Sequence, residues 1–190
     1  DKVLIVYKFI RNASNATAKN WQVLYDDNGN SITTNGTYSC SGGDTTPQAN
    51  MNRYITLNVK QGEQISIDLS ADSANTPIKI ASGIWDTTII ADINWTGSIS
   101  YPSNDTIMTI YGDVKSFYCY NNKTKVTEID VSNNIALCTL YCANNQLTSL
   151  DVSNNTALTY LACNTNQLTS LDVTKNTALT YLSCYNNQLT

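Results

Sequence analysis

Hydrophobic and polar positions repeat in a fixed cycle over the last third of the chain. Residues 126–146, 147–167 and 168–188 are three near-copies of one 21-residue segment. Apolar residues recur at the same offsets in each copy, and polar residues fill the gaps. In the middle copy the apolar positions are Leu147, Leu150, Val152, Leu158, Leu161 and Cys163. Their alternation around positions 150–152 and 161–163 is typical of β-strands, so we expect all six side chains to face inward.

A single copy buries too few side chains to offset the entropy of ordering its backbone. Stacked copies bury each layer against the next and add hydrogen bonds between neighbouring coils. The pattern therefore predicts a solenoid whose stability is a sum over neighbouring coils.

Two columns of asparagine and one of cysteine run through the copies. We expect the asparagines to face inward at corners, where an amide can bond backbone groups that are left unpaired. The cysteines occupy positions where a small buried hydrophobe fits, and we expect reduced thiols. Cys138 and Cys142 have the spacing of a zinc pair, but Cys138 falls on an outward position, so we expect no metal. The predicted structural ladder is Cys119, Cys142, Cys163, Cys184, Asn122, Asn145, Asn166, Asn187, Asn134, Asn155 and Asn176.

The motif L-x-x-L-x-C-x-x-N-x-L-x-x-L-D-V-S-x-N-x-x has the pattern of a short leucine-rich repeat. Over residues 105–190 it resembles the cysteine-ladder repeats of internalin-type surface proteins, and of surface proteins and lipoproteins from gut commensal bacteria. The resemblance implies a mostly β solenoid without regular convex helices. It also implies display outside the cell for protein binding or adhesion.

The first hundred residues show period-2 alternation and turn signals, and no sustained helical period. Asn28-Gly29 suits a tight hairpin. Residues 54–59 and 64–69 both alternate and are joined by a short turn, so we expect them to pair as a half-buried antiparallel hairpin. Two packed sheets around one core suit a segment of about 100 residues, so we expect a β-sandwich-like domain. The expected strands are 3–9, 21–25, 54–59, 64–69, 78–81, 87–95, 98–100 and 107–111.

The expected fold class is therefore mainly β, with two domains. A β-sandwich-like domain spans residues 1–104, and a leucine-rich repeat solenoid spans residues 105–190. The solenoid begins with an irregular coil at 105–125, continues with the repeats 126–146, 147–167 and 168–188, and starts a further repeat at 189–190. We expect the sandwich and the irregular coil to cover the open apolar end of the solenoid.

Composition narrows the function classes. The net charge is −4, the pI is about 4.6, and the 11 basic residues do not cluster, which disfavours nucleic-acid binding. No apolar stretch is long enough to span a membrane. The chain begins at Asp1 rather than Met, and we interpret it as a piece of a longer exported protein. We expect that protein to lie at the cell surface or outside the cell. A lipid anchor would lie outside these residues.

Catalytic residues are not indicated. The chain has no histidine, which removes the commonest general base and a frequent metal ligand. The start of a calcium loop at Asp26 lacks the required glycine and the final glutamate. We therefore expect no enzyme activity, no cofactor and no metal.

Outward positions of the cysteine-bearing strands carry tyrosines on one sheet face, which we favour as the concave one. Tyrosine supplies a rigid contact surface with a hydroxyl and is enriched in binding surfaces. The alternative is that the rings only stabilise the sheet through cross-strand pairing. The candidate binding residues are Tyr118, Tyr120, Tyr141, Tyr160, Tyr181 and Tyr185.

A second outward column consists of Asp130, Asp151 and Asp172. These carboxylates either stay solvated and accept bonds from adjacent Ser and Thr, or bind a cation. The second choice is disfavoured because no further carboxylate completes a shell.

Three functional hypotheses follow. The leading one is a noncatalytic bacterial surface protein that presents the repeat face to a protein on a host or neighbouring cell. The second is a carbohydrate-binding module in which the tyrosines, or Trp85 and Trp95, stack on sugar rings. The third is an accessory region of a longer surface enzyme.

Overall fold

The computed structural model describes residues 24–25, 31–32 and 47–190, and the chain divides into two compact units, residues 1–46 and 47–190. In the first unit, β1 (Leu24–Tyr25) pairs antiparallel with β2 (Ser31–Ile32). The expected turn at Asn28-Gly29 between them, the expected strand over 3–9 and Cys40 lie outside the described residues.

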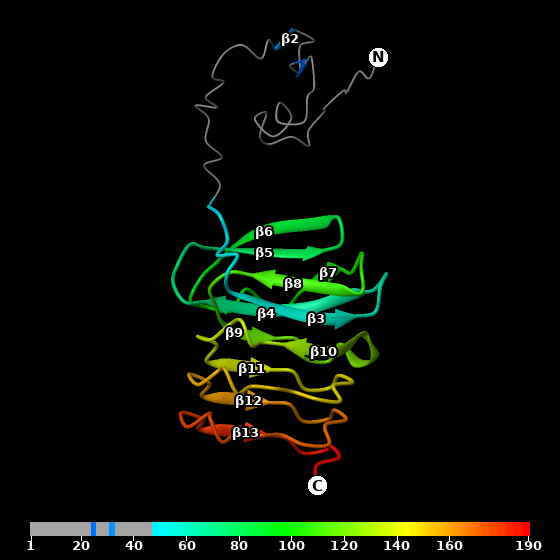
Figure 1. Cartoon of the computed structure of the whole chain (residues 1–190), viewed down its shortest axis with the longest axis vertical. Helices are drawn as coiled ribbons and strands as arrows, with labels where there is room; N and C mark the ends of the chain where they lie inside the picture. Colours follow the sequence, from blue (N-terminus) through cyan, green and yellow to red (C-terminus); the bar gives the residue numbers. More distant parts are fainter. Residues whose placement is uncertain (1–23, 26–30, 33–46) are drawn as a thin grey trace. The chain divides into compact units, whose positions relative to one another are not determined.

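The second unit is built from β-strands and one short 3-10 helix, and its described residues contain no α-helix (Figure 1). The mainly β expectation is confirmed. β3 and β8 have the expected bounds, and the other expected strands in this unit shift by a few residues. The elements are β3 (Tyr54–Val59), β4 (Gln64–Ala71), β5 (Thr76–Ser82), β6 (Trp85–Ala91), β7 (Ile99–Pro102), β8 (Ile107–Tyr111), β9 (Val114–Tyr118), η1 (Lys123–Lys125), β10 (Val126–Asp130), β11 (Thr139–Tyr141), β12 (Tyr160–Ala162) and β13 (Tyr181–Ser183).

Two sheets enclose one apolar core. The five-stranded sheet has the order β10-β3-β8-β5-β6, and the six-stranded sheet has the order β13-β12-β11-β9-β4-β7. Every second residue of β3 and β4 is buried, because successive side chains of a strand point to opposite faces. Ile55, Ile67 and Phe117 are fully or almost fully buried in this shared core.

The pairing expected between β3 and β4 is wrong. β3 pairs with β8 and β10, whereas β4 pairs with β7 and β9, so the two strands lie in different sheets. The turn between them contains Gly62 at φ +81°, and it carries the chain from one sheet to the other. Each strand then points its apolar side chains at the core from an opposite side, which satisfies the same alternation as a hairpin.

Both sheets continue through the boundary that was expected at residue 104. β4 pairs antiparallel with β9, with Leu69 opposite Phe117, and β3 pairs antiparallel with β10. The compact unit therefore starts at Pro47 and has no division at residue 104. The physical reason is that β3 and β4 offer free edges to the first coil, so the ladder hydrogen bonds and the core pass directly into the repeats.

The repeats form coils that stack through parallel strands. β9, β11, β12 and β13 pair in order, with Phe117, Leu140, Leu161 and Leu182 as register partners. The other expected strand position of the repeat forms a strand only in β10. β10 has β3 as an antiparallel partner. An Asp side chain accepts the backbone N–H two residues on in all three coils, so this local bond does not decide which coil forms the strand.

The turn between β8 and β9 depends on a glycine. Gly112 has φ +133°, and a Cβ at this position would lie 2.5 Å from Ile78 Cδ1 and 2.9 Å from the carbonyl oxygen of Pro77. Only glycine fits this backbone conformation and this close approach. The residue thus allows the chain to leave the five-stranded sheet and begin the first coil.

Candidate binding face

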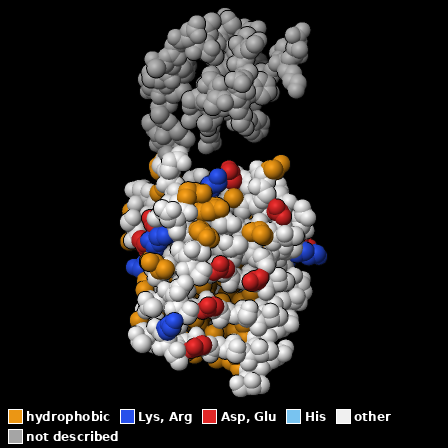
Figure 2. Space-filling view, viewed as in Figure 1, with side chains coloured by type: hydrophobic (Ala, Val, Ile, Leu, Met, Phe, Trp, Pro, Cys, Tyr) orange, Lys and Arg blue, Asp and Glu red, His pale blue; other side chains and the backbone are white. Residues whose placement is uncertain are grey.

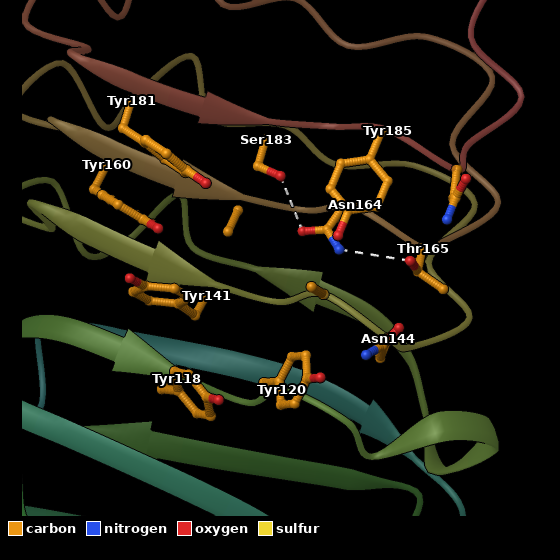
Figure 3. Close-up of a pocket in the computed structure, with 13 residues that line it drawn as sticks. Tyr118, Tyr120, Tyr141, Asn144, Tyr160, Asn164, Thr165, Tyr181, Ser183 and Tyr185 are labelled. Carbon is orange, nitrogen blue, oxygen red and sulfur yellow. Dashed lines mark hydrogen bonds between the residues drawn. The ribbon is translucent and has the colours of Figure 1, made fainter.

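The parallel register places the predicted tyrosines on one outward face of the six-stranded sheet. Tyr118 is the register partner of Tyr141, and Tyr160 is the register partner of Tyr181. The two pairs occupy adjacent outward columns, because Tyr141 lies opposite Ala162 rather than Tyr160. The four rings therefore follow a diagonal across the strands, which we call the tyrosine row (Figure 3).

The rings of the tyrosine row are in contact from coil to coil. The ring centroids of Tyr160 and Tyr181 lie 4.1 Å apart with planes at 8°, and those of Tyr141 and Tyr160 lie 4.6 Å apart at 28°. Tyr118 and Tyr141 are 5.1 Å apart and tilted by 44°. Because neighbouring rings cover one another's faces, the row presents mainly ring edges and hydroxyls to solvent.

Trp95 extends the tyrosine row toward the N-terminal strands. Its ring meets Tyr118 at 6.3 Å and Tyr141 at 6.4 Å, both in edge-on geometry. Trp85, the other tryptophan considered for sugar stacking, packs against the core and contacts Tyr101 instead. The structure therefore brings one of the two tryptophans to the predicted face. No spacing signal in the sequence could place Trp95 here, because the contact joins a loop after β6 to the strands β9 and β11.

A hollow of about 340 Å³ lies beside the tyrosine row. Tyr120 and Tyr185 stand at its two ends (Figure 3). Its lining has no charged side chain and consists of aromatic rings, amides, hydroxyls and small residues. The lining residues are Tyr118, Tyr120, Tyr141, Ala143, Asn144, Tyr160, Ala162, Asn164, Thr165, Tyr181, Ser183, Tyr185 and Asn186. All six predicted tyrosines are thus brought together; the polar residues Asn144, Asn164 and Asn186 were not singled out from the sequence.

Two hydroxyls of the tyrosine row, those of Tyr118 and Tyr160, stay protonated because their pKa is raised. Interaction with the Tyr141 hydroxyl, followed by burial and interaction with the Tyr181 hydroxyl, raises the pKa of Tyr160 well above its usual range. Burial is the first cause that raises the pKa of Tyr118, and nearby Tyr120, Tyr141 and Asp68 add to it. Neutral phenols both donate and accept hydrogen bonds, so the face offers both roles to a ligand.

The first asparagine column joins neighbouring coils. Asn145 Nδ2 donates to the carbonyl oxygen of Cys119 at 2.9 Å and to that of Cys142 at 3.0 Å. Asn166 repeats this pattern one coil later, and its Oδ1 accepts the backbone N–H of Leu147. Asn187 donates to the carbonyl oxygens of Cys163 and Cys184, and its Oδ1 accepts the backbone N–H of Leu168. Asn122 bonds both backbone groups of Ser66 in β4.

The second asparagine column works in the same way at the opposite corner. Asn155 Nδ2 donates to the carbonyl oxygens of Val131 and Asn134 at 3.0 and 2.8 Å. Asn176 repeats this with Val152 and Asn155, and Asn134 donates to the carbonyl oxygen of Val114. Each buried amide therefore holds two successive coils at a fixed spacing, which keeps the tyrosine-bearing strands in register.

The cysteine column lies inside the stack. Cys119, Cys142 and Cys163 are fully buried, and Cys184 is half-buried in the last coil. Every cysteine among residues 47–190 is a free thiol, including the half-buried Cys138. Burial raises the pKa of Cys142 well above its usual range and that of Cys163 to about 12. These thiols are therefore protonated and serve as packing groups.

The aspartate column is exposed, and its carboxylates bond the backbone. Asp130, Asp151 and Asp172 each accept a backbone N–H at 2.8 Å, from the residue two positions on. Backbone bonds from Ser153 and Thr174 are the first causes that lower the pKa of Asp151 and Asp172. Figure 2 shows acidic side chains spaced along the coils. Within residues 47–190 no group of three or more His, Cys, Asp and Glu side chains is placed to hold a metal ion.

No helix in the described part of the chain is long and apolar enough to cross a membrane. No protein-family model matches the sequence, and no curated protein matches it. A solved structure described as the functional domain of InlJ from Listeria monocytogenes, which includes a cysteine ladder, is similar to this chain. The two are 40% identical over 47% of this chain and 20% of that chain, with a TM-score of 0.40. This chain thus matches about a fifth of that chain's length.

Proposed function

We propose that this chain is a noncatalytic binding module of a bacterial cell surface, and that the tyrosine row is the contact surface for a protein partner. The observation that carries the proposal is the continuous contact between the rings of Tyr118, Tyr141, Tyr160 and Tyr181 at outward positions of a hydrogen-bonded ladder. The proposal includes the finer fold class, in which residues 105–190 are a leucine-rich repeat solenoid that continues a β-sandwich. The 21-residue spacing of β11, β12 and β13 supports that class.

Preorganisation favours binding at this surface. Protein association loses free energy when interface side chains must be ordered, at about 0.5 to 1.5 kcal/mol for each flexible side chain. Tyrosine has only two side-chain torsions, and here each ring is held by its neighbours before a partner arrives. Ring edges and neutral hydroxyls then offer apolar contact and hydrogen bonds at little further entropy loss.

The uncharged lining defines the kind of partner surface that fits. An anionic group pressed against this face loses its hydration and finds no cation in the hollow, and the Asp68 carboxylate lies beside Tyr118. A surface of neutral polar and aromatic groups avoids that loss. Surface display is supported by the resemblance of the repeat motif to internalin-type proteins and by the acidic, unclustered charge of the chain.

Binding to an array of purified extracellular and cell-surface proteins tests the proposal. The full chain is compared with the double variant Tyr160→Ala/Tyr181→Ala. The matched control is Thr127→Ala/Thr148→Ala, whose residues line a separate hollow beside the other segment of the coils. We expect the tyrosine variant to weaken binding by about tenfold or more, as loss of an aromatic hot spot does, and the control to bind normally.

Two results would contradict the proposal. The first is an array in which no protein binds the full chain. The second is a partner whose affinity is unchanged in the tyrosine variant and reduced in the threonine control, which would move the contact surface to the other side of the coils. Circular dichroism of both variants shows whether the fold is retained.

A further inference from the structure

The hollow beside the tyrosine row is open along the stack of coils. Tyr120 and Tyr185 occupy the same column, with Ala143 and Asn164 between them. Three strand spacings separate the two tyrosines, or roughly 14 Å. Small and polar residues in the intervening coils leave the space that the two rings bound.

The two end rings differ from those of the tyrosine row. Tyr185 is 64% exposed, and among the described residues its ring contacts no other aromatic ring. Tyr120 is 37% exposed, and within residues 47–190 the one aromatic ring that it meets is that of Tyr118, at 5.5 Å and with planes tilted by 50°. Each end ring therefore keeps an open apolar face, whereas the faces inside the tyrosine row are covered.

The floor of the hollow supplies neutral hydrogen-bonding groups. Asn164 Oδ1 accepts the hydroxyl of Ser183 at 3.1 Å, and its amide nitrogen faces Thr165 (Figure 3). Asn144 and Asn186 also line the hollow. Amides and hydroxyls offer donors and acceptors at once, and they suit a ligand whose own polar groups are hydroxyls.

We propose that this hollow binds an uncharged oligosaccharide, laid along the coils from Tyr120 to Tyr185. The two end rings pack against the C–H faces of terminal sugar units, and the asparagines bond the hydroxyls between them. The proposal concerns the same face as the proposed function and goes beyond it, since it names a second class of ligand. A site of apolar rings with a few convergent polar groups is the usual form of a small-ligand site.

The lining disfavours two other ligand classes. Sulfated, phosphorylated or carboxylated ligands would find no cation among the residues that line the hollow. An extended peptide would find no free backbone edge among β9, β11 and β12, which are paired on both sides; the open edge belongs to β13, at the end of the sheet. A neutral sugar chain needs neither a counter-charge nor a strand edge.

Titration of the full chain with neutral hexose oligomers of one to four units, followed by calorimetry, tests the inference. We expect affinity to rise with each added unit until the ligand reaches both end rings. Tyr185→Ala and Asn164→Leu should each weaken binding by about fivefold to tenfold. Tyr54→Ala is the matched control, since Tyr54 pairs with Tyr111 away from the hollow, and it should bind as the parent does.

Three outcomes overturn the inference. Absence of binding at millimolar sugar, equal binding of sulfated oligomers, or binding unchanged in both hollow variants excludes a neutral-sugar site here. If a protein partner still binds in a manner that depends on Tyr160 and Tyr181 while no sugar binds, this inference fails and the proposed function stands. If sugars bind and no protein does, the proposed protein partner fails and the sugar site stands.

Discussion

Arg53 and Asp113 join the start of β3 to the turn between β8 and β9, with Nη1 and Oδ1 2.8 Å apart. The same Nη1 lies 2.8 Å from Oδ2 of Asp72, and Nη2 donates to Oδ1 of Asn134 at 3.4 Å. Asn134 belongs to the second asparagine column. One guanidinium thus connects the N-terminal strands of the core to the first complete repeat.

We predict that Arg53→Lys lowers the free energy of unfolding by about 1 kcal/mol, because an ammonium cannot reproduce the planar fork that meets several acceptors. The partners are each about a third exposed, and solvent keeps the value modest. Denaturant unfolding measures the change. Lys79→Gln, which removes the more exposed pair with Asp86, should cost less; a larger loss there would contradict the assigned role of Arg53.

The positions of the strands could be predicted well from the sequence, but which strands pair with one another could not. The bounds of β3 follow from the period-2 pattern that the strand itself contains, and those of β8 follow from the turn signals on either side of an apolar segment. The pairing of β3 with β4 was not predictable, because a hairpin and a crossing between two facing sheets impose the same alternation. The contacts of Arg53 depend on three segments that meet only in the folded chain, so no local pattern signals them.

The candidate binding face, too, could be predicted in part from local positions and in part only from the folded register. Outward placement of the tyrosines follows from their positions relative to the buried cysteines. The diagonal row does not, because Tyr141 and Tyr160 occupy different columns and meet only once the parallel register is known. The hollow is also a product of register, since it depends on Ala143 and Asn164 falling between Tyr120 and Tyr185.

Asn155→Ala should lower the free energy of unfolding by about 2 kcal/mol. The substitution removes the donor of two hydrogen bonds to the carbonyl oxygens of Val131 and Asn134 in a buried corner, at about 0.5 to 1.5 kcal/mol for each bond; both oxygens keep one backbone donor. Asn154→Ala is the control, because Asn154 is exposed and makes one long bond of 3.5 Å. Equal effects of the two substitutions in denaturant unfolding would exclude the clamp role of the asparagine column.

Thr165→Asn should raise stability. Thr165 has φ +55°, a left-handed conformation that Asn144 and Asn186 occupy at the equivalent positions of neighbouring coils. A β-branched residue is strained there, whereas asparagine tolerates it. We expect a gain of about 0.5 to 1 kcal/mol in thermal or denaturant unfolding. Thr148→Asn, at an exposed position without positive φ, should change little, and a loss of stability in Thr165→Asn would refute the strain.

Thiol alkylation should separate the cysteine column from the surface. Only the thiolate is nucleophilic, and burial both shields Cys142 and Cys163 and raises their pKa, that of Cys163 to about 12. Cys138 is half-buried and outside the column. Residue-resolved mass spectrometry after brief iodoacetamide treatment of the native chain should find Cys138 modified well before Cys142 and Cys163, with all of them modified in denaturant. Early modification of Cys163 in the native chain would place it outside the apolar interior.

Acid should destabilise the coils through the aspartate column. Backbone bonds lower the pKa of Asp151 and Asp172 below the ordinary value of 3.8, so the unfolded chain binds these protons at higher pH than the folded chain does. The stabilisation is complete above the unfolded pKa and is lost as pH falls through the lowered folded pKa. Thermal unfolding followed over roughly pH 5 to pH 2 should therefore show a falling midpoint, with a shallower fall in Asp151→Asn/Asp172→Asn, whose amides do not titrate. If the unfolding midpoints of the variant and the parent fell equally with pH, these carboxylates would contribute nothing to the acid response, and the turns would be stable without their negative charge.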